Sequence, residues 1–317
     1  MNTVTFNSDA NQSFEVSVSA NGHQSFGYAG VFGSNVGYPT GDSCYVNLID
    51  WQHHTIHFQM DVDTYQDMRT RYDAINLESS EYLYIWVEED SFGQITNWRI
   101  FKSTLDLQHL YPIYQATYHF ESLYQLFELV ESLQTIPLRM FGRAVLSDLQ
   151  LMKSFISIPA SKRHHHSYPG GLLAHSLECA FIAAQNLDAI QDISKIEKEV
   201  TTVASLLHDI GKTQTIGQVQ HTSMGRLLDH EQLTLLVLAE PLNQLTQYWP
   251  KGAETLQYLL MWNHKMGFCR YVGGNIIKLA DQLSTSTSLR RMAFEGKPSY
   301  FHFSVIDSIS KCNTCRN

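Results

Sequence analysis

The chain has 317 residues, of which 44% are hydrophobic and 17% are charged, and its formal net charge is −9. These proportions are typical of a globular protein that is long enough for two compact domains, each with its own core. The acidic balance argues against a protein that coats nucleic acid through a broadly basic surface, but a metal site and a few local cations can still hold a phosphate-bearing substrate.

The expected location is a reducing cytoplasm, without membrane contact. The first residues have neither the basic start nor the apolar run of a signal peptide. The apolar runs are too short to cross a membrane. The five cysteines are scattered and odd in number, which does not suggest a disulfide framework.

The first hundred residues are predicted to be β-rich. They hold segments rich in β-branched and aromatic residues, separated by turn formers, at residues 14–19, 44–51, 55–62, 82–88 and 94–102. A helical pattern lies near residues 64–72. Five strands with one interposed helix suggest a small barrel or sandwich, with an OB-like barrel as one candidate. Residues 1–104 would then form a nucleic-acid-binding domain.

From about Leu105 the periodicity becomes helical, as the spacing of Leu123, Leu126, Val130 and Leu133 shows. Further helices are expected at residues 142–155, 171–186, 196–208, 229–238, 253–262 and 274–283. The predicted fold is therefore a two-domain α+β protein. A helical connector (105–149) would join the β-rich domain to an all-α domain (150–317).

The strongest chemical signal is the sequence Leu206-Leu207-His208-Asp209-Ile210-Gly211-Lys212, where an apolar helix ends in an adjacent His-Asp pair. Imidazole and carboxylate together suit Mn, Fe, Co, Ni or Zn, and a carboxylate can bridge two ions. Lys212 would then face a substrate phosphate. The simpler alternative is that His208 caps the helix and Asp209 pairs with Lys212.

Other polar residues interrupt helices that otherwise look like core. Upstream, Pro169, Gly170 and Gly171 mark a loop, and His175 would lie in the first turn of the helix that follows. Downstream come His230, His264 and Asp281. A buried polar group is costly unless it is paired or ligated, so these positions are candidate ligands.

The order His175, His208-Asp209, His230, His264, Asp281 resembles the HD superfamily of metal-dependent phosphohydrolases, over about residues 150–290. The resemblance implies that His175, His208, Asp209 and Asp281 bind one metal ion. It also implies that His230 and His264 hold a second ion, with Asp209 as the bridge. Two divalent ions (Mn, Fe, Co, Ni or Zn) are therefore the expected cofactors, although a lone histidine on an apolar helix face is more often a core residue.

Two subfamilies compete within this resemblance. The stretch PASKRHHHSYPGGLLAHSL is similar to 3′-to-5′ exoribonucleases that place an OB-like domain before an HD domain. The same histidine triplet, followed by LLHDIGK, is also similar to the HD domain of relaxases of certain conjugative plasmids, which cut single-stranded DNA. Both imply a single-stranded RNA or DNA substrate. The exonuclease interpretation is favoured because it also accounts for the β-rich half.

The expected catalytic residues are Asp209, Lys212 and the triplet His164, His165, His166. The resemblance implies that Asp209 bridges two ions that activate a water, that Lys212 offsets charge on the phosphate, and that the triplet positions the phosphate or protonates the leaving group. A solvent-exposed loop is the alternative for the triplet. Arg290, Arg291 and Lys297 could form a cationic rim to a substrate channel or a solvated face.

The sequence leaves several function classes open. The alternatives to an exonuclease are a relaxase-like endonuclease, a nucleotidase or cyclic-nucleotide phosphodiesterase, a non-catalytic nucleic-acid-binding module, and a di-iron oxygenase. The choice between RNA and DNA is also open, and a homo-oligomer is compatible with the sequence.

Overall fold

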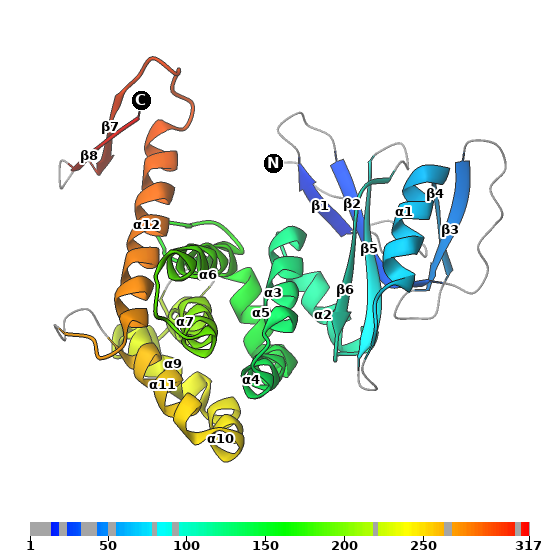
Figure 1. Cartoon of the computed structure of the whole chain (residues 1–317). Coiled ribbons are helices and arrows are strands. Elements are labelled where there is room, and N and C mark those ends of the chain that lie inside the picture. Colours follow the sequence, from blue (N-terminus) through cyan, green and yellow to red (C-terminus); the bar gives the residue numbers. More distant parts are fainter. Residues whose placement is uncertain are drawn as a thin grey trace. The chain divides into compact units, whose positions relative to one another are not determined.

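The computed structural model describes residues 14–18, 24–32, 43–49, 55–77, 81–90, 95–217, 221–262, 268–307 and 312–316 (Figure 1). The chain divides into two compact units, residues 1–111 and residues 112–317. Strands prevail in the first unit and helices in the second, which confirms the predicted α+β layout. No helix in the described ranges combines the length and the apolar character needed to span a membrane.

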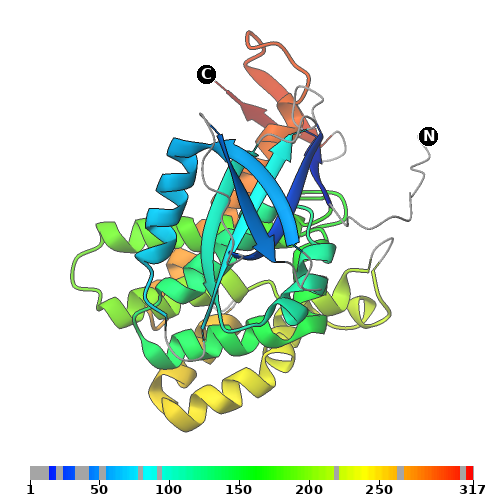
Figure 2. The same cartoon turned by 90° about the vertical axis from the view of Figure 1, so that its right-hand side faces the viewer.

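Unit 1 is built on an antiparallel sheet. Its strands are β1 (Phe14–Val18), β2 (Gln24–Phe32), β3 (Ser43–Ile49), β4 (Thr55–Asp61), β5 (Tyr82–Asp90) and β6 (Ile95–Ser103). Their order is β4-β3-β2-β5-β6, with β1 paired to β2. Helix α1 (Val62–Asp73), drawn in blue in Figure 2, joins β4 to β5 and contacts β3, β4 and β6. The Asp61 carboxylate caps this helix by accepting the Thr64 N–H at 2.8 Å.

The core of unit 1 follows from the alternation of side chains along its strands. Val46 and Leu48 on β3 are fully buried, and so is Met68 on α1. Phe58, Met60, Ile85 and Val87 join the same cluster. Successive residues of a strand point to opposite faces, so alternate apolar positions cover one side of the sheet. The helix then closes that side.

In unit 1 the sequence prediction missed one strand. Strands lie close to all five predicted ranges, but β2 was not foreseen. Its Gly27 and Gly30 lower the intrinsic strand propensity of a segment that is otherwise aromatic. Pairing with β1, β3 and β5 nevertheless places β2 in the middle of the sheet.

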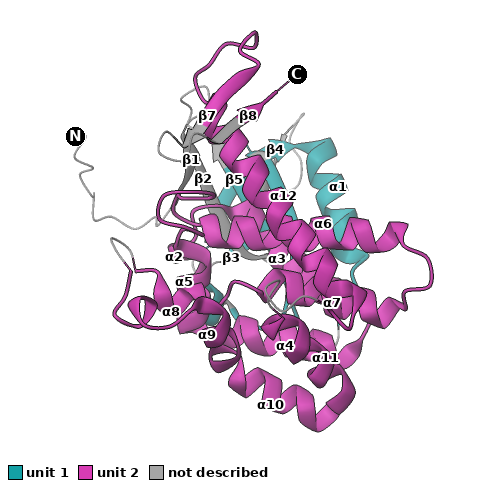
Figure 3. Ribbon diagram, turned by 90° about the vertical axis from the view of Figure 1, so that its left-hand side faces the viewer, with its two compact units in different colours: residues 1–111 teal, residues 112–317 magenta. Residues whose placement is uncertain are grey.

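Unit 2 is mostly helical (Figure 3). Helix α2 (Leu107–Ala116) runs across the boundary between the units. The elements that follow are α3 (Phe120–Ser132), α4 (Ile136–Ser147), α5 (Leu149–Ser157), α6 (Gly171–Ala189), α7 (Lys195–Leu207), α8 (Lys212–Thr215), the 3-10 turn η1 (Met224–Arg226), α9 (His230–Val237), α10 (Ala239–Tyr248), α11 (Pro250–Met261), α12 (Val272–Phe294), β7 (Phe303–Asp307) and β8 (Cys312–Cys315).

The structure of unit 2 differs from the prediction in three details. The helix expected at residues 142–155 is two helices, because Asp148 ends α4 and its carboxylate caps α5 by accepting the N–H groups of Gln150 and Leu151. Helix α12 continues to Phe294 instead of ending near 283. Unit 2 is also not all-α, because β7 and β8 form an antiparallel hairpin that contacts α12.

Helices α6, α7 and α12 pack against one another at the centre of unit 2. Small residues make this close packing possible: Cys179 and Ala183 on α6 and Ala280 on α12 are all fully buried in one cluster. Polar side chains that these three helices direct inward are therefore brought close together.

Candidate metal centre

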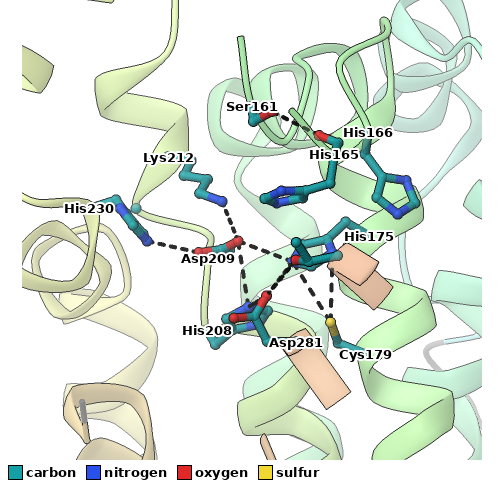
Figure 4. A network of polar contacts seen from close by, with 12 residues as sticks. Ser161, His165, His166, His175, Cys179, His208, Asp209, Lys212, His230 and Asp281 are labelled. Carbon is teal, nitrogen blue, oxygen red and sulfur yellow. Dashed lines mark hydrogen bonds and ion pairs between the residues drawn. The ribbon is translucent and has the colours of Figure 1, made fainter. Parts of the chain in front are cut away.

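Four of the predicted ligands lie where α6, α7 and α12 meet (Figure 4). His175 is in the second turn of α6, His208 caps the C-terminus of α7 and Asp209 follows it, and Asp281 is on α12. His175 is 0% exposed and Asp209 is 4% exposed. Ionisable groups this deeply buried are rare unless they are paired or bind a metal.

Two glycines allow the loops around the site to pack closely. Gly170 has a φ of 77°, a left-handed conformation in which glycine is not strained. At Gly211, directly beyond Asp209 and Ile210, an added Cβ would lie 2.0 Å from the backbone oxygen of His230. The absence of a side chain at Gly211 therefore lets the start of α9 approach the turn that carries Asp209.

Four side-chain atoms converge on one point. His175 Nε2 lies 3.3 Å from Asp209 Oδ2 and 3.4 Å from Asp281 Oδ1. His208 Nε2 lies 3.5 Å from Asp209 Oδ2 and 4.0 Å from Asp281 Oδ1. Ligand atoms about 2.1 Å from a common ion lie roughly 3.0 to 3.4 Å apart. The arrangement therefore matches the donor set of one divalent ion with little adjustment.

The second oxygen of Asp209 faces another histidine. His230 Nε2, at the first position of α9, lies 2.9 Å from Asp209 Oδ1. Asp209 thus presents one oxygen to His175 and His208 and the other to His230. A carboxylate in this position can bridge two ions. His264, the other ligand implied for a second ion, lies outside the described residues.

The charge states suit a cation. Burial opposes ionisation of Asp209, but Lys212 and His208, with hydrogen bonds from His175 and His230, hold its pKa well below the ordinary value. Burial lowers the pKa of His208, which favours the neutral ring that binds a metal. Burial also opposes a charge on His175, but Asp209 and Asp281 raise its pKa well above the ordinary value. Those carboxylates stabilise a positive charge at the place where an ion would bind.

Outer hydrogen bonds orient both imidazoles. His208 Nδ1 lies 2.7 Å from the Ser205 carbonyl oxygen, to which it can only donate. Among the residues that the structure describes, His208 Nε2 is buried without a hydrogen-bond partner. His175 Nδ1 lies 2.9 Å from Ser284 Oγ, whose hydroxyl donates to Glu178 Oε2 at 2.8 Å. Histidines that bind metals commonly donate their other ring N–H in this way, which leaves the lone pair of Nε2 for the ion.

The sequence prediction missed Cys179, Glu178 and Ser284. His175, Cys179, His208 and Asp281 each offer an atom within 4.8 Å of the others, so Cys179 belongs to the candidate metal cluster. Its Sγ lies 3.8 Å from both ring nitrogens of His175. Burial raises the pKa of this thiol, which disfavours the thiolate that binds metals. The spacing of Glu178 and Cys179 from His175, three and four residues on a helix, was the available signal.

The three histidines of the triplet occupy different environments. His164 is exposed, and its backbone N–H donates to Ser161 Oγ. The His165 ring lies 5.0 Å from the His175 ring between centroids, and burial lowers its pKa to about 4. His166 is buried and its Nε2 lies 3.1 Å from Glu178 Oε2. The structure therefore brings His165 and His166 to the cluster and leaves His164 outside it.

Lys212 contacts the cluster through Asp209. Its Nζ lies 2.5 Å from Asp209 Oδ2, which is the pairing that the simpler reading of the His-Asp sequence expects. A role for Lys212 toward a substrate phosphate stays a prediction, because the ammonium group would have to exchange or share this partner.

Comparison with known proteins supports a nuclease-like family. The TraI_2 family, described as "Putative helicase", matches residues 116–263. The 3′-5′ exoribonuclease YhaM of Halalkalibacterium halodurans is 27% identical over 119 residues, which are 36% of this chain and 35% of that protein. The enzyme of the same name from Bacillus licheniformis is 25% identical over 115 residues, 35% of each chain. The chain thus matches only about a third of these relatives' length. No solved structure matches.

Proposed function

We propose that this protein is an HD-type metal-dependent phosphodiesterase that shortens single-stranded nucleic acid from the 3′ end. The observation that carries the proposal is that His175 Nε2 and His208 Nε2 each lie 3.3 to 4.0 Å from both Asp209 Oδ2 and Asp281 Oδ1. The similarity to exoribonucleases supports the choice of substrate class and direction.

The donor set fits hard or borderline divalent ions such as Mn, Fe, Co, Ni or Zn. His175, His208, Asp209 and Asp281 would hold one ion, and Asp209, His230 and His264 would hold another. Bound ions would polarise a phosphoryl oxygen and lower the pKa of a water. Asp209 would remain ionised throughout, because Lys212, His208, His175 and His230 stabilise its charge against burial.

The residues around the cluster then have distinct roles. Lys212 would place a positive charge beside the non-bridging phosphate oxygens, where charge grows in the transition state. His165, with a pKa lowered by burial to about 4, is neutral at pH 7. It would therefore position the phosphate or the water through a neutral ring nitrogen, in preference to protonating the leaving group.

Unit 1 would hold the strand. Its five strands β2 to β6 form a continuous antiparallel order, with α1 inserted between the third and fourth of them. This arrangement supports an OB-like barrel, a fold whose exposed strands and loops bind oligonucleotides. The proposal assigns binding to this unit and cleavage to unit 2.

The family description names a helicase, and a helicase motor requires a nucleoside triphosphate-binding loop of the form G-x-x-x-x-G-K-[ST]. In this chain Gly211-Lys212-Thr213 supplies the last three positions, but the first position is Leu206, a buried residue of α7. We therefore do not assign strand unwinding driven by nucleotide hydrolysis to this segment.

The test uses end-labelled single-stranded RNA and DNA of one sequence, with Mn added or with a chelator. Asp209→Asn removes the bridging charge at constant size, and Asp229→Asn makes the same change at an exposed neighbouring position. We expect a ladder of shortened products from the wild type and the Asp229 variant. Asp209→Asn should lose more than about 100-fold in rate, beyond the loss typical of outer hydrogen-bond partners.

The other outcomes would change the assignment. Full activity in chelator would contradict a metal-dependent reaction. A single discrete cut in DNA would instead indicate the relaxase-like endonuclease, and cleavage of mononucleotides without cleavage of oligomers would indicate a nucleotidase.

A further inference from the structure

A cavity of about 760 Å³ lies beside the metal cluster, in unit 2. Its lining comes from the C-terminal part of α12, from His166 to Tyr168, and from Arg316 after β8. Pockets that bind small molecules or nucleotides commonly have volumes of roughly 300 to 1,000 Å³. We name this cavity the arginine pocket, because Arg290, Arg291 and Arg316 all line it.

The arginine pocket is basic, although the chain as a whole is acidic. Three arginines line it with a single acidic residue, Glu295, although the whole chain carries a net charge of −9. Arg290 and Arg291 are exposed, and no hydrogen bond or ion pair engages either guanidinium among the residues that the structure describes. Such cations are available for an anionic ligand, and arginine suits phosphate because it donates two parallel hydrogen bonds.

Arg316 has a different role. Its guanidinium donates to the carbonyl oxygens of Lys297, Pro298 and Phe301, and it lies 4.5 Å from the centroid of the Phe294 ring. Arg316 thereby ties the end of β8 to the end of α12. It shapes the pocket wall, while Arg290 and Arg291 supply positive charge, part of which, from Arg291, also acts on Glu178 and lowers the pKa of that carboxyl group.

Aromatic side chains accompany these cations. Tyr168 lines the arginine pocket and is 36% exposed. On the adjoining segment that leads into β7, Tyr300 is 72% exposed, and Phe303, the first residue of β7, is 74% exposed. Single-stranded nucleic acid is commonly held by this combination, with cations along the backbone and aromatic rings on which bases stack.

Helix α12 connects the arginine pocket to the metal cluster. Asp281 and Ser284 lie at the cluster, Ser288 accepts the His166 N–H at 3.0 Å, and Arg291 lines the pocket. The ten residues from Asp281 to Arg291 span about 15 Å of helix at roughly 1.5 Å per residue. That length corresponds to about four stacked nucleotides at roughly 3.4 Å each.

We propose that the arginine pocket binds a nucleotide of the single-stranded substrate a few positions from the scissile phosphodiester, with Arg290 and Arg291 on its phosphate and Tyr168 against its base. This proposal rests on the proposed function and adds a substrate-length requirement to it. A dinucleotide would occupy the metal cluster alone, whereas a strand of about five nucleotides would also reach the pocket.

The experiment measures kcat/KM for labelled oligonucleotides of two to eight nucleotides. In the wild type we expect an increase of about tenfold or more once the strand reaches the pocket. Arg290→Gln/Arg291→Gln should abolish this increase and leave dinucleotide cleavage unchanged. It should also reduce the slope of log kcat/KM against log salt for the octamer by about 0.7, the value for one single-strand phosphate contact.

The matched control is Lys195→Gln/Lys251→Gln, which removes two exposed charges at the starts of α7 and α11. It should retain both the length dependence and the salt slope. A length dependence that survives in the arginine variant, or that is lost equally in the control, would overturn the proposal.

The two proposals can fail separately. If the wild type cleaves no phosphodiester, the proposed function fails. The arginine pocket is then tested by fluorescence anisotropy of a labelled pentamer in chelator. Weaker binding in the arginine variant alone supports the pocket, and equal binding of wild type and variant contradicts it.

Discussion

Replacing Ser284 with alanine tests whether the outer hydrogen bonds serve the metal cluster. Ser284 Oγ lies between His175 Nδ1 and Glu178 Oε2, at 2.9 and 2.8 Å. The alanine variant removes this link without touching any candidate ligand. His175 Nδ1 then loses its acceptor in a position where the side chain is fully buried.

The expected losses follow from these contacts. Leaving a buried donor unpaired costs about 1 to 3 kcal/mol of folding free energy. Removing an outer partner of a ligating histidine weakens metal affinity by about 10- to 100-fold. At saturating Mn the stabilisation by bound metal should therefore fall by a further ~1.4 to 2.7 kcal/mol.

Ser288→Ala provides the matched control, one turn further along α12. Ser288 is also buried, but its Oγ accepts the backbone N–H of His166, and no hydrogen bond links it to a candidate ligand within the described ranges. Chelator competition should give the Mn dissociation constant of each variant, and urea unfolding in chelator should give its intrinsic stability. Both variants should lose similar intrinsic stability, and only Ser284→Ala should lose metal affinity. Equal Mn affinity in the two variants would refute the reasoning.

Three further variants address the surroundings of the cluster. Gly211→Ala should lower the free energy of unfolding, measured in urea, by at least about 1 to 3 kcal/mol, because the new Cβ would overlap the His230 backbone oxygen. Wild-type stability of this variant would show that α9 does not need the close approach. Burial depresses the folded-state pKa of His165 to about 4, so the unfolded chain binds its proton first and the free energy of unfolding falls as the pH is lowered from 6.5 to 4. His165→Gln should therefore show a smaller loss of stability over this pH range in chelator. Identical pH profiles of the wild type and the variant would contradict this. Cys179→Ser should leave Mn affinity unchanged, because burial disfavours the thiolate; a clear loss of affinity by chelator competition would make the sulfur a ligand.

Local patterns in the sequence were sufficient to find the polar residues at helix ends and on apolar faces. His175, His208, Asp209 and Asp281 stand out because a buried ionisable group requires a partner. The hydrogen-bond partners of these residues could not be found in the same way. Ser284 contacts His175 from 109 positions away in the sequence, so no periodicity within one helix could reveal the contact.

The histidine triplet illustrates a second limit. Its sequence gives no sign of which ring faces inward. His166 has a φ of 44°, an unusual conformation for a residue other than glycine. The turn at this position accompanies the divergence of the His165 and His166 rings, whose planes are 80° apart. Contacts within the loop and with α12 hold this conformation, because the His166 carbonyl accepts the Ala160 N–H and the His166 N–H donates to Ser288 Oγ.

The length of α12 was underestimated for a related reason. Residues 284–288 read Ser-Thr-Ser-Thr-Ser, a composition with modest intrinsic helix propensity. In the structure Ser284 and Ser288 are buried and hydrogen-bonded to the loop and to α6. Tertiary contacts thus sustain the helix where the local sequence would let it end.

Because α12 is one continuous helix, it fixes the distance between the metal cluster and the arginine pocket. One rigid rod carries Asp281 at one end of the site and Arg291 at the other, so thermal motion cannot easily change the distance between the two. In the proposed arrangement, a strand would be gripped at a fixed interval from the bond that is cut. Chains shorter than that interval would lack the second contact and be cleaved more slowly. The chain length at which cleavage slows would therefore follow from the length of helix between Asp281 and Arg291.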